Sequence, residues 1–326
     1  MNIMVLGAGT WGTALSIVLN NNAHKVTLWH YKKDFIDKLG RDRIHPKLNC
    51  NIPSTIKFTN NINHINKYEM IVIAIPTQTI RETLDDLISI PENLLIVNAS
   101  KGIEVTSLNT VSNILEEVTT ISKNNIIALY GPSHAEEVVK KLPTTIVAAS
   151  DNIDNARLVQ DVFSNQFFRV YSNNDIIGVE IAGSIKNIIA IAAGISVGVG
   201  FGDNTLAALI TRGIAEIKRL GLKMGAKEST FVGLSGIGDL IVTATSLHSR
   251  NRKLGYRIGQ GEKYNDIIKG MTMIAEGVET SKAIYKLSKK INIEMPICNE
   301  VYNILFKNKD PKSAINDLMS RKLIDE

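Results

Sequence analysis

The strongest constraint on the fold is an alternation of short apolar runs with helical stretches over residues 1–171. The runs are rich in β-branched residues and show little polar alternation, which is typical of strands buried on both faces of a parallel sheet. Amphipathic stretches such as residues 78–88 and 108–119 separate several runs. This alternation predicts a doubly wound, Rossmann-like α/β domain. The eight candidate strands are "NIMVLG", "KVTLWH", "TIKFT", "EMIVIAIP", "NLLIVNAS", "NIIALYG", "TTIVAAS" and "FFRVYS".

The strand pattern stops after about residue 175, and the remainder shows helical stretches separated by Gly-, Asn- and Asp-rich turns. Residues 204–220, 271–289 and 299–306 are examples. The change predicts a dinucleotide-binding domain over residues 1–175 and an all-helical substrate domain over residues 176–326. Because no low-complexity linker separates them, we expect the domains to pack tightly and to form a cleft.

Composition and charge exclude several classes of protein. The 44% apolar and 21% charged content is that of a soluble globular chain. The net charge, 37 − 32 = +5, is spread through the chain and indicates little about partners. Cys50 and Cys298 lie far apart, which argues against a disulfide framework or a zinc site, so we expect isolated thiols and no metal.

No targeting or membrane segment is expected. The chain opens "MNIMVLGAG", without a cationic region or a cleavage site for a signal peptide. The most apolar stretch carries Glu180 and Lys186 in its first half, and its uncharged remainder falls short of the ~20 residues that a span needs. We therefore expect a buried helix there, and a cytoplasmic protein.

A glycine motif follows the first candidate strand. In "IMVLGAGTWGTAL", Gly7, Gly9 and Gly12 have G-x-G-x-x-G spacing. Gly7 would make the tight turn, Gly9 would let the backbone approach a pyrophosphate, and Gly12 would let helix and strand pack closely. The motif in this context predicts a dinucleotide site, with a purely structural turn as the alternative.

The end of the second candidate strand bears on the choice of dinucleotide. An NAD-specific fold places an acid there to hold the ribose hydroxyls, whereas this chain reads "LWHYKK", with His30, Tyr31, Lys32 and Lys33. The cations could attract a 2′-phosphate, so we expect NADPH to be preferred and NADH tolerated. The alternative is that both lysines are merely exposed on a loop.

Lys186 lies in "EIAGSIKNIIAIAAG", where its helical neighbours are small or apolar. Burying a lysine there is costly without a partner, and a lowered pKa is expected. The alternative is a lysine whose head group reaches solvent. With Asn187 beside it, Lys186 suits a carbonyl substrate, since one residue can donate a proton while the other orients the oxygen.

Other candidates follow strands or glycine-rich segments. In "GLSGIGDLIVT", the glycines predict a tight turn that aims Asp239 at the cleft, where it would hold the Lys186 ammonium; an N-cap is the alternative. In "NASKGIE", Lys101 lies just past a strand, where ligands bind in open α/β sheets. "YGPSHAEE" also follows a strand, and its candidates are Gly131, Ser133 and Ala135.

The basic run "TATSLHSRNRKLGYR", residues 243–257, predicts a phosphate cradle. Ser249 is a good N-cap for a helix through Ile258, and free backbone N–H groups with the Arg250 guanidinium could bind one phosphate. Arg252, Lys253 and Arg257 would fall on other faces. A nucleic-acid patch would need interleaved aromatic residues, and only Tyr256 qualifies.

The blocks "GAGTWGTAL", "ASKGIE", "GPSHAEE", "AGSIKNIIAIAAGI", "GLSGIGDL" and "SRNRKLG" together resemble the signatures of bacterial NAD(P)-dependent glycerol-3-phosphate dehydrogenases, in the family's order and over essentially the whole chain. The resemblance implies reversible reduction of dihydroxyacetone phosphate to sn-glycerol 3-phosphate, for phospholipid synthesis, with Lys186 as proton donor and acceptor. It implies substrate contacts from Lys101, Gly131, Ser133, Lys186, Asp239, Ser249, Arg250 and Asn251. It implies dinucleotide contacts from Thr10, Trp11, His30, Lys101, Ala135, Arg250, Ile274 and Glu276.

Some departures and alternatives remain. Thr10 stands where the family often has Ser, and His134 where Phe is common; the segment after the second strand lacks a clear arginine. A β-hydroxyacid dehydrogenase of the 6-phosphogluconate type would also carry a lysine on the first helix of its helical domain, but "SRNR" and "ASKG" argue against it. A non-catalytic dinucleotide sensor would not need Lys186 or Asp239. The oligomeric state is left open, with a homodimer as one alternative.

Overall fold

The computed structural model describes residues 1–85, 90–270 and 275–323, which form two compact units. Unit 1 consists of Met1–Lys101 and Asn109–Glu180, and unit 2 of Gly102–Leu108 and Ile181–Glu326. The chain therefore passes from one unit to the other three times, after Lys101, after Leu108 and after Glu180.

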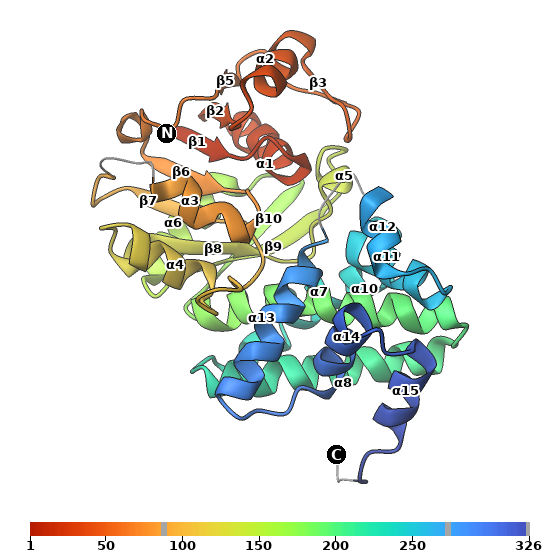
Figure 1. Ribbon diagram of the computed structural model, residues 1–326. Helices are drawn as coiled ribbons and strands as arrows, with labels where there is room; N and C mark the ends of the chain where they lie inside the picture. The colour runs from red at the N-terminus through yellow and green to blue at the C-terminus, as the bar shows by residue number, and fades with distance from the viewer. Residues whose placement is uncertain (86–89, 271–274, 324–326) are drawn as a thin grey trace. The chain divides into compact units, whose positions relative to one another are not determined.

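Unit 1 is built on an eight-stranded sheet that contains all eight predicted strands (Figure 1). The strand order is β10-β9-β8-β7-β6-β1-β2-β5. The part from β5 to β8 has the order of a dinucleotide-binding fold, with its switch point between β1 and β6. The prediction of a doubly wound α/β domain is confirmed. The strands are β1 Asn2–Leu6, β2 Lys25–Trp29, β5 Lys57–Thr59, β6 Met70–Ile73, β7 Leu95–Asn98, β8 Ile126–Tyr130, β9 Thr144–Ala149 and β10 Phe168–Asn173.

The expectation of a purely parallel sheet is wrong at one place. Strand β9 runs antiparallel to β8, with Leu129 opposite Ala148. The connection between them contains only α5, Ala135–Val138, which is four residues long. A helix of that length spans ~6 Å, whereas the chain would have to return ~17 Å along β8 to start a parallel strand. The next strand therefore starts at the edge where β8 ends.

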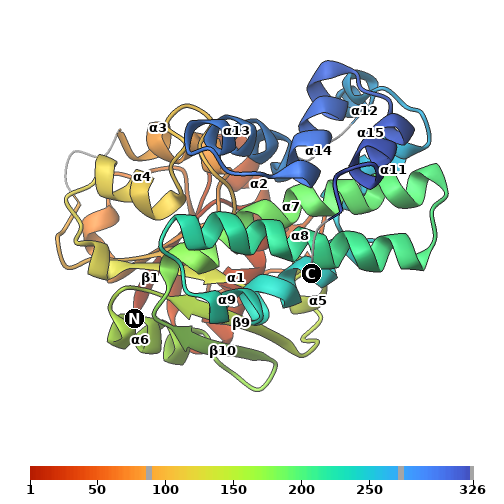
Figure 2. The same ribbon diagram turned by 90° about the horizontal axis from the view of Figure 1, so that it is seen from below.

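Helices cover both faces of this sheet. Helices α1 and α6 contact each other, and α3 contacts α4; the two pairs lie on opposite faces (Figure 2). Between them the apolar strand residues, such as Val5, Val72 and Leu129, are fully buried. The longer helices are α1 Thr10–Asn21, α2 Lys33–Asp42, α3 Ile80–Asp85, α4 Val111–Val118 and α6 Ile153–Phe163; two short strands, β3 Ile44–His45 and β4 Cys50–Asn51, pair separately.

In unit 2 the described residues form helices and no strand, as predicted. Helix α7 passes a length-and-composition test for a membrane span, but 89% of its most apolar window is buried inside the protein, so it is the predicted core helix. A bent pair, Glu228–Thr245 with Arg250–Gly259, passes the same test and is equally weak evidence. The helices are α7 Ile176–Val199, α8 Asp203–Lys223, α9 Glu228–Phe231, α10 Asp239–Thr245, α11 Arg250–Gly259, α12 Tyr264–Gly270, α13 Glu276–Lys290, α14 Pro296–Lys307 and α15 Pro311–Met319.

Glycines bring α7 and α11 into backbone contact. A Cβ atom on Gly194 would lie 2.1 Å from the carbonyl oxygen of Arg252, and one on Gly255 would lie 2.0 Å from that of Ile191. Gly198 and Gly259 repeat the contact one turn further along, so the helices run in the same direction. The beginning of α11 is thereby held beside the middle of α7, where Lys186 lies.

Candidate functional site

The candidate residues of unit 1 gather at one edge of its sheet. Strands β1, β2, β7 and β8 belong to the parallel part, so their carboxyl ends meet at the same edge (Figure 1). Gly7 and His30 directly follow β1 and β2, Gly131 directly follows β8, and Lys101 comes three residues after β7 ends. This is the edge at which open α/β sheets bind ligands.

The glycine motif has the geometry that a dinucleotide requires. Gly7 has φ +113°, and a Cβ atom there would lie 2.4 Å from the carbonyl oxygen of Ala74. A Cβ atom on Gly12 would lie 1.9 Å from the carbonyl oxygen of Gly7, whereas one on Gly9 would meet nothing within 4 Å. Helix α1 then begins at Thr10 without a side-chain cap. Open space beside Gly9 and an uncapped helix start fit a pyrophosphate.

The residues after β2 form an aromatic and basic group. The His30 ring stacks on Tyr31, with centroids 4.7 Å apart, and burial lowers the pKa of His30. The Lys33 ammonium forms an ion pair with the Asp37 carboxylate, with Nζ 2.7 Å from Oδ2. Among the described residues Lys32 has no ion pair; its ammonium lies 5.5 Å from the centroid of the Tyr31 ring. Lys32 is therefore the better candidate of the two lysines for an additional phosphate.

Lys101 is held by the end of β8. Its ammonium donates to the carbonyl oxygen of Gly131 at 3.1 Å and lies 5.5 Å from the centroid of the Tyr130 ring. Ser133 Oγ donates to the same carbonyl at 3.1 Å. Gly131 has φ +152°, and a Cβ atom there would lie 2.8 Å from Cα of Ile146, so only glycine fits. Ala135 follows as the first residue of α5.

Unit 2 holds a buried cluster around Lys186. The Lys186 ammonium donates to the Asp239 carboxylate and, at 2.7 Å, to Thr243 Oγ1. Lys186 is 6% exposed and Asp239 1% exposed. The predicted pairing of Lys186 with Asp239 is confirmed, and a hydroxyl also binds the ammonium of this buried lysine. The sequence interpretation missed Thr243; its position one helical turn after Asp239 is the signal that could have found it.

The predicted tight turn before Asp239 is wrong. Leu234–Gly238 form a π-helical segment that continues into α10, and Asp239 is the first residue of that helix, not its N-cap. A Cβ atom on Gly236 would lie 2.2 Å from the carbonyl oxygen of Phe231, so glycine permits the wider helical turn. Such segments often occur at functional sites because they shift a side chain out of the regular helical register.

Two amides next to Lys186 orient one another. Asn251 Nδ2 donates to Asn187 Oδ1 at 3.0 Å, and Asn251 Oδ1 accepts from the backbone N–H of Gly277 at 3.0 Å. Asn187 therefore has its oxygen toward Asn251 and its NH₂ group directed away from that bond. The Asn251 side chain uses its oxygen and one N–H in these two hydrogen bonds and so orients Asn187. The family resemblance implies a phosphate contact for Asn251 in addition.

The predicted N-cap at Ser249 is confirmed. Ser249 Oγ accepts from the backbone N–H of Arg252 at 3.2 Å, and α11 begins at Arg250. Arg250 is exposed at this helix start, and its charge acts on Glu276, whose pKa burial raises to about 7. Arg257, by contrast, forms a two-bond ion pair with Glu262. Ile274 lies outside the described residues.

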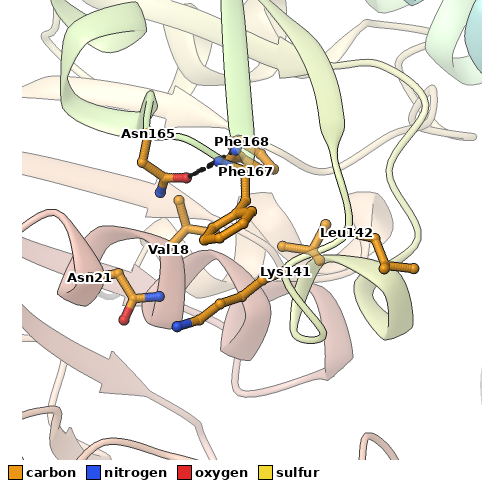
Figure 3. Close-up of a pocket in the computed structure, with 8 residues that line it drawn as sticks. Val18, Asn21, Lys141, Leu142, Asn165, Phe167 and Phe168 are labelled. Atoms are coloured by element: carbon orange, nitrogen blue, oxygen red, sulfur yellow. Dashed lines mark hydrogen bonds between the residues drawn. The ribbon is translucent and has the colours of Figure 1, made fainter.

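A surface hollow in unit 1 is lined by none of these candidate residues (Figure 3). Phe167, Leu142 and Lys141 line it together with Val18 and four neighbours. Its volume of about 20 Å³ suits a water molecule and not a substrate.

Comparisons with known proteins agree over the whole chain. The family model described as "NAD-dependent glycerol-3-phosphate dehydrogenase N-terminus" matches residues 2–156, and its C-terminal counterpart matches residues 175–316. A NAD(P)+-dependent glycerol-3-phosphate dehydrogenase of Chlorobium limicola is 48% identical, over 99% of this chain and 98% of its own length. One of Oceanobacillus iheyensis is 46% identical, over 99% and 95%. The crystal structure of glycerol-3-phosphate dehydrogenase from Coxiella burnetii matches with a TM-score of 0.93 at 35% identity, over 98% and 99% of the two chains.

Proposed function

The chain belongs to the NAD(P)-dependent glycerol-3-phosphate dehydrogenase family, and on this premise we propose which residues carry the reaction. The enzyme is an oxidoreductase that interconverts dihydroxyacetone phosphate and sn-glycerol 3-phosphate with NAD(P), and the product serves phospholipid synthesis. Family membership removes the two alternatives, a β-hydroxyacid dehydrogenase of the 6-phosphogluconate type and a non-catalytic sensor.

Lys186 and Asn187 act on the carbonyl oxygen of the substrate. Bound NAD(P)H supplies the hydride that reaches the carbonyl carbon. The Asn187 N–H groups, aimed by Asn251, bind the oxygen as negative charge develops on it. The Lys186 ammonium then gives that oxygen its proton, while Asp239 and Thr243 keep the ammonium in place. The observation that carries this assignment is the buried Lys186–Asp239–Thr243 cluster next to an oriented amide.

The phosphate group binds to the start of α11. Arg250 offers a planar pair of donors, and the first backbone N–H groups of the helix favour an anion. Lys101, Gly131 and Ser133 provide the remaining substrate contacts from unit 1, at the sheet edge that also holds the dinucleotide. The nucleotide itself binds along Gly7–Gly12, where the open space beside Gly9 supports the assignment.

NADPH is the preferred dinucleotide, and NADH is tolerated. The basic group after β2 supports this, because Lys32 is available for a 2′-phosphate and no acid directly follows the strand to repel one. We further propose that the enzyme acts in the cytoplasm as a homodimer. Light scattering at several protein concentrations tests the dimer.

One assay tests the assignment as a whole. Purified enzyme should consume NADPH, followed at 340 nm, when dihydroxyacetone phosphate is added, and should consume NADH less efficiently. Binding of NADPH without turnover of this substrate would contradict the proposed roles of Lys186 and Asn187.

A further inference from the structure

A second buried acid, Glu180, lies on α7 six residues before Lys186. It is 1% exposed. Its carboxylate accepts hydrogen bonds from Asn98 Nδ2 at 3.0 Å, from the backbone N–H of Ser112 at 3.0 Å and from Ser112 Oγ at 2.5 Å. Thr110 also donates to it. Burial raises the pKa of Glu180, and these donors act in the opposite direction. Nothing in the reaction described above uses this group.

Hydrogen bonds link Glu180 to the residue before Lys101 through Asn98 and Tyr130, and we call this series of bonds the path. Asn98 Nδ2 gives one hydrogen to Glu180 and the other to the Tyr130 hydroxyl, at 2.8 Å. That hydroxyl donates in turn to the carbonyl oxygen of Ser100. Asn98 Oδ1 accepts from the backbone N–H of Ser100 at 2.9 Å. Both backbone polar groups of Ser100, the residue before Lys101, are therefore held by the path.

The path also reaches the side chain of Lys101. The Lys101 ammonium lies over the ring of Tyr130, whose hydroxyl belongs to the path. The same ammonium donates to the carbonyl oxygen of Gly131, the residue after Tyr130. Glu180 and the Ser100 backbone N–H together fix the orientation of the Asn98 amide. With Glu180 as a pure acceptor, the NH₂ group of Asn98 must face Glu180 and Tyr130, and its oxygen must face Ser100. Without that acceptor one hydrogen of the Asn98 NH₂ group loses its partner, and the amide can shift away from the positions in which it bonds to Tyr130 and Ser100.

The residues that bond to Glu180, directly or through Asn98, lie near the points where the chain passes between the two units. Each of the three points at which the chain passes between units has such a residue, or Glu180 itself, close by: Ser100 before the first, Thr110 after the second and Glu180 at the third. A single carboxylate thereby ties together, inside unit 1, the three segments that lead to unit 2.

We propose that Glu180 is a positioning residue for Lys101, acting through Asn98, Tyr130 and Ser100. The proposal rests on the proposed contact of Lys101 with the substrate and adds the group that holds it in place. What matters is hydrogen-bond geometry and not negative charge. A glutamine can serve in place of Glu180, because its oxygen can accept from Asn98 and Ser112 N–H while the Ser112 hydroxyl reverses to accept from its NH₂ group.

Three variants test the path. A displacement of about 1 Å at a positioned group can cost ~10²-fold in rate. We therefore expect Glu180→Ala and Tyr130→Phe to lower kcat/KM for dihydroxyacetone phosphate by about 10- to 100-fold, with the KM for NADPH little changed. Glu180→Gln should restore most of the activity. Glu216→Ala is the matched control, since it also removes a buried acid, one that accepts from the backbone of Ile297 and Cys298; it should lower stability without a comparable loss of kcat/KM.

A double-mutant cycle with Lys101→Ala identifies the residue through which Glu180 acts. If Glu180 acts through Lys101, adding Glu180→Ala to Lys101→Ala should cause little further loss. Losses that multiply, or a Glu180→Gln enzyme as impaired as Glu180→Ala, would overturn the proposal.

A readout independent of activity separates this proposal from the function on which it rests. Lysines of the intact enzyme can be ¹³C-dimethylated, and the Lys101 signal assigned by its loss in Lys101→Arg. Because the ammonium lies over the Tyr130 ring, its signal should move in Glu180→Ala and stay in Glu180→Gln. If Lys101→Ala leaves kcat/KM unchanged, the substrate role of Lys101 fails, while the signal still decides whether Glu180 positions it. An unmoved signal in Glu180→Ala would overturn the positioning role.

Discussion

Lys186 keeps its ammonium between the Asp239 carboxylate and the Thr243 hydroxyl, all three nearly excluded from water. Removing one member of such a pair leaves an uncompensated buried charge, which costs more than the pair itself contributes. The same arrangement that makes the cluster structurally sensitive also holds the proposed proton donor in one orientation. Residue-level tests must therefore separate lost chemistry from lost folding.

Lys186→Ala should lower kcat by ~10²–10⁴-fold, the usual loss of a general acid, with NADPH affinity nearly unchanged because the glycine motif lies in unit 1. Asp239→Asn should damage the same step, so the double variant should be little worse than Lys186→Ala alone. Steady-state kinetics, with thermal unfolding of each variant as control, measure this. Independent multiplication of the two losses would contradict the functional pairing.

Arg250→Ala should lower kcat/KM for dihydroxyacetone phosphate by about 30- to 900-fold, which corresponds to roughly 2–4 kcal/mol for a lost phosphate partner. Turnover of unphosphorylated dihydroxyacetone should change far less. Arg257→Ala is the matched control on the same helix, because that guanidinium is already paired with Glu262. Equal losses on both substrates would show that Arg250 does not bind the phosphate.

Lys32→Ala should reduce kcat/KM with NADPH and leave that with NADH almost unaltered, since only NADPH carries the 2′-phosphate. Lys33→Ala should do little with either dinucleotide, because Lys33 is paired with Asp37. The ratio of the two kcat/KM values in each variant is the measurement. A similar decrease with both dinucleotides would argue against recognition of the 2′-phosphate by Lys32.

Among the helices, α14 shows how one element depends on another. Its N-cap, Met295, offers no capping side chain. The carboxylate of Glu216, on α8, replaces the missing cap. It accepts hydrogen bonds from the backbone N–H groups of Ile297 at 2.7 Å and Cys298 at 3.3 Å. Burial raises the pKa of Glu216 from 4.5 to about 7, and the two N–H groups only partly offset that effect. A buried acid from α8 thus anchors the start of α14.

Glu216 gives the stability a pH dependence. Because its folded pKa of about 7 exceeds the unfolded value of 4.5, folding favours the protonated acid. The stabilisation of the fold by protonated Glu216 is complete below about pH 4.5 and is lost as pH rises through 7. The loss lowers the free energy of unfolding by about 3 kcal/mol. Glu216→Gln should remove this component, so the unfolding free energy of wild type relative to the variant should fall between about pH 4.5 and 7 and stay level above that range. Chemical denaturation measures it. Glu262→Gln, at an exposed site with a lowered pKa, should show no such trend.

For the whole molecule, the division into units does not follow chain order. The segment Gly102–Leu108 belongs to unit 2, although unit 1 precedes and follows it. Ile103, which is 0% exposed, is part of the apolar core formed by α7, α8 and α13. The stability of the helical unit therefore depends on a residue from the middle of the Rossmann-like half.

Ile103→Ala should lower the free energy of unfolding by about 2–5 kcal/mol, the usual range for truncating a fully buried isoleucine. Ile44→Ala, a truncation at a position 48% exposed, should change it by well under 1 kcal/mol. Chemical denaturation of both variants tests the expectation. A loss at Ile103 no larger than that at Ile44 would mean that this segment adds nothing to the core of unit 2.

The sequence by itself determined the features that depend on neighbours along the chain. Eight apolar runs became eight strands, the glycine spacing became the turn before α1, and Ser249 became the N-cap of α11. Periodicity, turn conformation and capping are local, so residues within one or two turns decide them. They were enough to identify the fold class and to propose Lys186, Asp239 and the helix start at Arg250 as site candidates, while the full set of candidate contacts came from the family resemblance.

Only the tertiary structure decided how distant segments meet. Lys186 meets Thr243 across 57 residues, β9 reverses against β8, and Glu180 meets Asn98 across 82 residues. No local pattern encodes these pairings. They form because buried charges and amides require partners, and the partner available to each is whichever one packing brings within hydrogen-bond reach. That is why the sequence could name Asp239 but not Thr243, and why the path from Glu180 to Lys101 became visible only in the folded chain.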